Sequence, residues 1–403
     1  MPISWCWTLR RAPGWSESPW TGIPLTSIDW EHAIATPELL DYYRSHIGVA
    51  YQCSGWISEA TADSVRHYAE GIGDDNPLFI DPAYAGASPF GGMIAPPTFA
   101  SVFSNKGGQA EDGFSGGPIK GLFGLWAGDR WQFFEPVRLG DRLTATFSLV
   151  SLRQRPSRFG KTAYETVEEV RYHNAQGRRL STYQTVRFNY ERAAAREQAK
   201  YAEVTPYRYS DDEIEAIQRA YDGEAARRRG ATPRYWQDVA EGEELPPLVK
   251  GPLTLTQLIG FVLGWGSAFC MTNRLAHQFN QAHPGAVLIN REFNMPDNIE
   301  GAHWDLSLAQ QSGFPYTYDF GCMRTAWCAH LLTDWAGDLG WVTDLDVQIR
   351  RPGIIGDTQW VHGRVQAKRR DGEKALVDVE LWAVNQRGDT TTVGSATVSL
   401  PSR

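Results

Sequence analysis

The sequence lacks an excess of basic residues. Lys and Arg number 39 against 47 Asp and Glu, which gives a formal net charge of −8 at pH 7. A nucleic-acid surface needs clustered cations that release the counterions of phosphate, and no basic stripe occurs along the chain. We therefore expect no nucleic-acid partner.

Cysteine is also scarce. The five cysteines are odd in number and form no C-x-x-C pair; they are Cys6, Cys53, Cys270, Cys322 and Cys328. This usage fits neither a disulfide framework nor a zinc clip. Reduced thiols of a cytoplasmic protein are the simplest interpretation.

Long apolar runs are missing. The longest, Leu258–Met271, has 14 residues, whereas a bilayer span needs about 20, so it predicts a buried helix. The N-terminal residues contain two arginines but no apolar region and no small-residue cleavage site, so we expect no signal peptide. We expect no membrane contact.

Several motifs that carry chemistry are absent from the sequence. It has no phosphate-binding loop with Lys-Ser/Thr, no G-x-G-x-x-G after a strand, no G-x-S-x-G and no H-E-x-x-H. Nucleotide-binding, serine-hydrolase and zinc-protease functions therefore have no support. The glycine-rich stretch Gly107–Gly128 predicts a loop or lid over the molecule.

What the chain does contain is a repeat. A length of 403 residues suggests two units, and the two halves match at a constant shift of 224. Asp81 pairs with Asp305, and the other matches are Ala85 with Ala309, Ser88 with Ser312 and Phe90 with Phe314. Farther along, P-x-x-x-G-D occurs at Pro136 and Pro352, and N-x-Q/R-G at Asn174 and Asn385. The order is the same in both halves, which indicates a duplicated unit.

Each half has a helical front followed by an antiparallel meander. Segments rich in Val, Thr and aromatic residues predict strands at 142–151, 163–173, 180–190, 361–368, 375–384 and 390–400. Between the halves, 210–230 has a Ser N-cap, early acids and late arginines, as a solvent-facing helix would. The predicted organisation is an extension (1–40), an N-terminal unit (41–192), a helical linker (193–236) and a C-terminal unit (237–403).

The stretch 68–100, YAEGIGDDNPLFIDPAYAGASPFGGMIAPPTFA, resembles the MaoC-like, hydratase-2-type acyl dehydratases. Their signature runs approximately G-D-x-N-P-[IL]-H-x-D, followed by a His-Gly that opens a long helix. The resemblance implies an α+β double hot-dog fold: two antiparallel sheets, each wrapped around a central helix and arranged as a pseudo-dimer. It also implies addition or removal of water at an enoyl or 3-hydroxyacyl thioester. In the family, the motif Asp and His act on water and a Gly N–H holds the thioester oxygen.

The first half departs from this pattern. Asp74 matches the motif acid, but Phe79 stands where the His belongs and Pro97 where the Gly belongs. Phenylalanine transfers no proton and proline has no backbone N–H, so this half is expected to be non-catalytic, with Asp74 holding a turn. Its central helix, which follows Pro96 and soon meets Gly107, should be short. The resemblance then implies room for a bulky or branched acyl group.

The second half restores two of the three parts. His303 lies at the His position, and Gly321 follows eighteen residues later at the predicted start of a helix. The position five before the His is Asn298, with Asp297 beside it. Asp297 is the first candidate for the acid, Glu300 and Asp305 the others, although Asp305 matches Asp81 and a capping role shared by both halves suits it better.

Tyr318, Asp319 and Arg324 flank Gly321 and are candidates for lining the acyl pocket together with Glu300. They could equally form the start of the helix. The first hypothesis is thus an acyl-CoA hydratase or dehydratase with no metal and no cofactor other than the thioester, CoA-bound or carrier-bound, and a homo-oligomeric, commonly dimeric, state. The alternatives are a hot-dog acyl-CoA thioesterase, in which Asn298 or an acid positions water, and a non-catalytic thioester-binding or partner subunit.

Overall fold

The structure is a computed structural model, and it describes residues 34–105, 114–157, 161–191, 204–267 and 269–403. Ten strands form one antiparallel sheet in the order β1-β3-β4-β5-β2-β9-β12-β11-β10-β6. The strands that form it are β1 (Ala50–Cys53), β2 (Phe123–Phe133), β3 (Thr144–Ser157), β4 (Lys161–His173), β5 (Arg179–Tyr190), β6 (Leu248–Lys250), β9 (Trp341–Ile349), β10 (Gln359–Asp371), β11 (Lys374–Asn385) and β12 (Thr390–Leu400).

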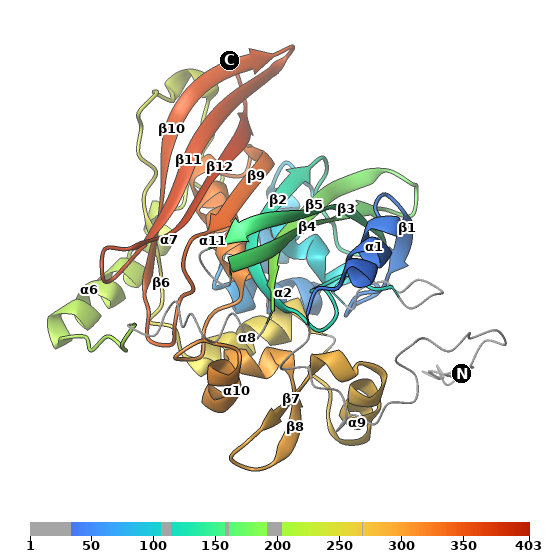
Figure 1. Cartoon of the computed structure of the whole chain (residues 1–403). Helices are drawn as coiled ribbons and strands as arrows, with labels where there is room; N and C mark the ends of the chain where they lie inside the picture. Colours follow the sequence, from blue (N-terminus) through green and yellow to red (C-terminus); the bar gives the residue numbers. More distant parts are fainter. Residues whose placement is uncertain (1–33, 106–113, 158–160, 192–203, 268) are drawn as a thin grey trace, which may run out of the picture.

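Helices pack against this sheet and at its ends. They are α1 (Pro37–Ser45), α2 (Ala62–Ile72), α3 (Pro77–Ile80), α4 (Pro82–Ala87), η3 (Pro97–Phe103), α6 (Asp211–Asp222), α7 (Glu224–Arg227), η4 (Trp236–Asp238), α8 (Leu255–Trp265), α9 (Asn273–Ala282), η5 (Pro284–Ala286), η6 (Ile299–His303), α10 (Leu306–Gln311) and α11 (Gly321–Ala336). A separate hairpin pairs β7 (Val287–Asn290) with β8 (Met295–Asn298). It lies with α9 and α10 at the far end of the molecule from the long strands β10–β12 (Figure 1).

The strand order reads as two copies of one five-stranded unit. From the centre outward, β2-β5-β4-β3-β1 mirrors β9-β12-β11-β10-β6, and the two copies join through the antiparallel pair β2–β9. The edge strands β1 and β6 have only four and three residues, which limits edge-to-edge association. This arrangement confirms the predicted α+β double hot dog.

One hairpin turn in each meander has the same set of side-chain hydrogen bonds. The side-chain oxygen of Asn174 accepts the amides of Gln176 and Arg178 at 3.1 and 3.0 Å. Asn385 accepts the corresponding two amides at 3.0 Å each. A glycine with positive φ completes both turns, at 76° for Gly177 and 79° for Gly388. Asn suits the position because its side chain mimics a backbone turn.

The predicted shift of 224 residues is visible in the backbone. An isolated bridge joins Ile94 to Arg138 in the first half, and one joins Tyr318 to Ile354 in the second. Since Tyr318 lies 224 residues after Ile94, the residues that follow are also equivalent, and Pro97 occupies the place of Gly321.

The two central helices differ as the sequence predicts. In the first half η3 is a 3₁₀ helix of 7 residues that begins at Pro97, whereas α11 is an α-helix of 16 residues. Thirteen of the residues of α11 are buried, so it forms the centre of the main hydrophobic core. The short helix of the first half is thus confirmed.

Three expectations need correction. Leu258–Met271 was expected to be wholly buried, yet α8 packs one face on α2 and leaves Ile259 and Leu263 52% and 69% exposed. The linker helix α6 ends at Gly223 rather than near residue 230, because α7 starts there as a separate turn.

The glycine-rich stretch also differs from the predicted lid where it is described: Phe114, Ile119 and Leu122 are buried in a second core cluster, and β2 follows. Most of the predicted extension 1–40, residues 107–113 of that stretch and 193–203 of the linker lie outside the described residues. None of the helices in the described ranges has the length and apolar character needed to cross a bilayer.

Candidate active site

His303 is the last residue of η6, next to the start of α11. Its imidazole stacks on the ring of Phe320, with centroids 3.8 Å apart and an interplanar angle of 22°. Phe320 is the N-cap residue of α11, directly before Gly321. The structure therefore brings the His and the Gly of the predicted site to one place.

The environment of His303 fixes its protonation. Burial lowers the pKa of its imidazole to about 4, against the hydrogen bond to Tyr318, which raises it. The ring is therefore neutral at pH 7. Its Nδ1 lies 2.8 Å from the carbonyl oxygen of Tyr318, and because a carbonyl only accepts, Nδ1 carries the proton. Nε2 is left with a free lone pair, the form of a general base.

Glu300 lies one turn before His303 on the same 3₁₀ helix. In such a helix side chains at i and i+3 eclipse, so the carboxyl and the imidazole emerge on one side of η6. Burial raises the pKa of Glu300 to about 7, offset in part by the hydrogen bond from the hydroxyl of Ser267. A base with a lowered pKa and an acid with a raised pKa thus lie on the same short helix, a combination found in many acid–base sites.

Asp297 and Asn298 build the start of η6. Asn298 is its N-cap, and its side-chain oxygen accepts the amide of Glu300 at 3.0 Å. Asp297 Oδ1 accepts the amide of Asn298 at 2.7 Å and its side-chain amide at 3.1 Å. In the first half Asp74 Oδ1 likewise accepts the amide of the N-cap Asn76, at 3.0 Å. Asp297 thus resembles Asp74 in accepting the amide of the N-cap residue, although it lies one residue before the cap and Asp74 lies two before it.

The spacing of the caps accounts for the displaced acid. Asp81 caps α4 and Asp305 caps α10, which confirms the capping role expected of both. The preceding caps Asn76 and Asn298 lie five and seven residues earlier. The second half therefore contains two extra residues within its motif.

Gly321 is the first residue of α11, where the amides have no partner within the helix. A Cβ built on it would lie 2.6 Å from Cδ1 of Trp126, so this close approach requires glycine. The indole N–H of Trp126 donates to Asp129 at 2.9 Å. Asp129 also accepts from Thr325 on α11 at 2.6 Å, and burial raises its pKa to about 6. The first half thereby supports the helix that carries Gly321.

Tyr318, Asp319 and Arg324 surround the same helix end. The phenol ring of Tyr318 lies 4.5 Å from the imidazole of His303, between ring centroids. Asp319 and Arg324 form a buried bidentate pair at 2.6 and 3.1 Å. Asp319 also accepts the amide of Gly353, and Arg324 donates to the carbonyl of Arg351. Since these groups are engaged within the protein, their geometry favours a structural role over contact with a substrate.

The first half lacks the corresponding parts. Phe79 is 2% exposed and belongs to the main core. Pro97 opens η3, so no N–H exists at the place equivalent to Gly321. A cavity of about 40 Å³ lies there, lined mostly by apolar groups that include Phe79, Pro97 and Trp341. It is large enough for a water molecule.

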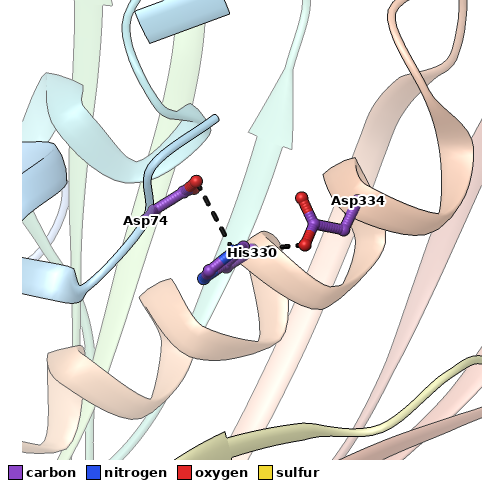
Figure 2. Close-up of side chains that lie close together, drawn as sticks. All are labelled: Asp74, His330 and Asp334. Carbon is purple, nitrogen blue, oxygen red and sulfur yellow. Dashed lines mark ion pairs between the residues drawn. The ribbon is translucent and has the colours of Figure 1, made fainter. Parts of the chain in front are cut away.

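Sequence reasoning missed one cluster. Asp74 holds its turn as expected, but its carboxylate also faces His330 of α11, beside Asp334 (Figure 2). The three side chains are 1–6% exposed. The spacing of His330 and Asp334, i and i+4 on one helix, was a sequence signal for part of this cluster. No sequence pattern indicated that Asp74 of the other half packs against them.

The sequence is similar to a family of dehydratase domains and to several curated proteins. The sequence model of the FAS1-like dehydratase domain region matches residues 45–183. Two curated relatives are "UPF0336" proteins. The chain is 37% identical over 100 residues to one from Streptomyces avermitilis, covering 24% of this chain and 63% of the relative. It is 32% identical over 114 residues to one from Thermobifida fusca, covering 27% of this chain and 72% of the relative.

Solved structures share the fold over most of the chain. A MaoC-like dehydratase superposes with a TM-score of 0.59 at 20% identity, over 90% of this chain and 100% of that one. A MaoC domain dehydratase from Chloroflexus aurantiacus gives 0.52 at 13% identity, over 89% and 96%. The peroxisomal multifunctional enzyme type 2 of Drosophila melanogaster gives 0.50 at 12%, over 90% and 51%. The chain therefore belongs to the family of the UPF0336 proteins, and it shares the fold of MaoC-like dehydratases.

Proposed function

We propose that the protein is a hydratase or dehydratase that adds or removes water at an enoyl or 3-hydroxyacyl thioester. One observation carries the proposal: a neutral imidazole with a free Nε2, that of His303, stacks on Phe320, the residue directly before Gly321 at the start of α11. General base and oxyanion donors in one place are what this reaction needs.

In the hydration direction, the thioester oxygen accepts a hydrogen bond from the amide of Gly321 and gains charge as the double bond is attacked. His303 Nε2 takes a proton from the water, whose oxygen bonds to the β-carbon. The protonated carboxyl of Glu300 gives its proton to the α-carbon. Dehydration is the reverse, so protons balance and no redox or metal cofactor enters the scheme.

Glu300 is our first choice for the acid because its pKa near 7 keeps much of it protonated at neutral pH. Asp297, the first choice from sequence, is a cap partner of Asn298. It remains the alternative, because it accepts the amide of its N-cap residue as Asp74 does in the first half. Substitution of each separately distinguishes the two.

We keep the bulky or branched acyl group as part of the proposal. Its support is the short η3 of the first half, which occupies less of the space under its sheet than α11 does in the second. The thioester is carried by CoA or by an acyl carrier. A panel of enoyl thioesters of increasing branching would show activity rising with size if the proposal holds.

The direct test is the loss of enoyl-thioester absorbance on incubation with the purified chain. The competing function is an acyl-CoA thioesterase, favoured by Asn298 at the expected place of the acid. Release of free thiol, followed with a thiol reagent, would select it. Inactivity in both assays, with activity regained on adding a catalytic relative, would select a non-catalytic partner subunit.

We also propose that the chain forms a homo-oligomer, the dimer being the simplest. The support is the outer face of α8, where Leu255, Ile259 and Leu263 are 41–69% exposed at i, i+4 and i+8. Apolar stripes of this kind mark contact surfaces. A monomeric mass in light scattering would refute this part.

A further inference from the structure

A buried charged cluster links the two halves and the linker, away from the candidate active site. Nε2 of His330 lies 3.5 Å from Asp74, 3.4 Å from Asp334 and 3.7 Å from Glu224, measured to the nearest carboxylate oxygens. All four residues are at most 8% exposed. Figure 2 shows the carboxylates of Asp74 and Asp334 directed at the imidazole from two different segments.

These groups are not satisfied by hydrogen bonds. Within the described part of the chain, no hydrogen-bond partner reaches Nε2 of His330, Oδ2 of Asp74 or Oε2 of Glu224. Leaving such atoms buried and unpaired costs about 1–3 kcal/mol each, more for charged groups. The orphan Nε2 of His330 is buried and lies within 3.5 Å of carboxylate oxygens of Asp74 and Asp334, which indicates that something further binds there.

The spacing between His330 and the two aspartates fits a metal ion. Hydrogen bonds between nitrogen and oxygen span about 2.7–3.2 Å, shorter than all three separations. Ligands of a tetrahedral divalent ion, at about 2.0–2.2 Å from it, lie about 3.3–3.5 Å from one another. The distances of 3.4 and 3.5 Å from Nε2 to Asp334 and Asp74 correspond to edges of such a tetrahedron, whereas the 3.7 Å to Glu224 is longer.

The charges favour the same occupant. Asp74, Asp334 and Glu224 supply three negative charges, and Arg228 supplies one positive charge through its 2.8 Å contact with Asp334. Lys250 Nζ lies 2.9 Å from His330 Nδ1 and donates to the carbonyl of Gly73 at 2.7 Å, and Arg228 also pairs with Asp75. A divalent ion at Nε2 would offset the excess of carboxylates over cations in this cluster.

We infer that His330, Asp74 and Asp334, whose ligand atoms lie within 4.8 Å of one another, form a site for a divalent metal ion such as Zn²⁺, with imidazole and carboxylate ligands and a fourth position for water. The ligands come from α11 and from the turn before α3. The ion therefore ties the non-catalytic half to the helix whose first residue is Gly321. It is a structural site, because it lies at the opposite part of α11 from that residue.

The test uses the full chain, stripped with a chelator and titrated with ZnCl₂ in a calorimeter. About one ion per chain is expected, together with a rise in Tm on binding. CoCl₂ in place of zinc should give the intense visible absorption of tetrahedral cobalt. Asp74→Asn, His330→Gln and Asp334→Asn should each weaken binding by more than about tenfold.

Two matched variants are controls. Asp81→Asn keeps a helix cap and His362→Gln changes a half-buried histidine that stacks on Trp382, and both should bind as the unsubstituted chain does. Absence of zinc binding, or equal affinity in the ligand variants, would overturn the site. Should the variants fail to fold, the cobalt spectrum of the unsubstituted chain decides: an octahedral spectrum or none contradicts the inference.

Discussion

The imidazole of His303 donates through Nδ1 to the carbonyl of Tyr318, 2.8 Å away. Tyr318 lies three residues before Gly321, so the same short segment orients the base and delivers the amide that opens α11. Because the second nitrogen of a neutral imidazole is then an acceptor, this bond selects the tautomer that a general base requires.

The pH dependence of kcat/KM follows from the two shifted pKa values. The base must be neutral, and burial lowers the pKa of His303 to about 4; the acid must be protonated, and burial raises the pKa of Glu300 to about 7. Activity should rise through about pH 4 and fall above about pH 7. Glu300→Gln should lose activity and its falling limb, whereas Asp297→Asn should keep that limb. The reverse result would make Asp297 the acid.

Glu300→Gln should also change stability with pH. The carboxyl has a folded-state pKa of about 7 against an ordinary 4.5, so its favourable contribution is complete below pH 4.5 and is lost as the pH rises through 7. At pH 8 the variant should be more stable than the unsubstituted chain by about 1–3 kcal/mol, and near pH 4.5 the difference should vanish. Denaturant unfolding at both pH values measures this. An equal difference at both would show that the carboxyl is not buried from water.

Gly321→Ala should destabilise the fold by about 1–3 kcal/mol, because the added methyl overlaps Trp126. Trp126→Ala removes the obstacle, although it also loses the hydrogen bond to Asp129. The double variant should therefore cost less than the sum of the single ones. Free energies of unfolding from a double-mutant cycle test this, and strict additivity would mean that the two residues do not meet.

Arg324→Met should cost about 3–5 kcal/mol, because it leaves Asp319 charged and buried without its partner. Arg66→Ala is the matched control, since it breaks exposed pairs with Asp63 and Glu70 that are worth less than about 1 kcal/mol. Urea unfolding compares the two. Similar small losses would show that the Asp319–Arg324 pair is solvated.

Much of the double hot-dog fold could be predicted from the sequence because its unit is repeated. Turn residues such as Asn174 and Asn385, and caps such as Asp81 and Asp305, act through bonds to their own backbone, so local sequence is enough to predict them. The six long strands of the meanders followed from composition for the same reason. The resemblance to the dehydratases added the expectation that His303 and Gly321 meet.

The rest depends on contacts between distant segments. Nothing near Asp74 in the sequence indicates that His330, 256 residues later, packs against it. The preference for Glu300 over Asp297 arises from the burial of its carboxyl against Ser267, which no spacing rule contains. The exposed face of α8 was missed because an apolar composition does not say which side finds a partner.

The most direct test of the account is enoyl-thioester hydration by His303→Gln beside the control His362→Gln. His303→Gln should lower kcat/KM by about 10²–10⁴ with the fold intact, while His362→Gln should leave hydration unchanged. Undiminished hydration by folded His303→Gln would contradict the central claim that this imidazole is the general base.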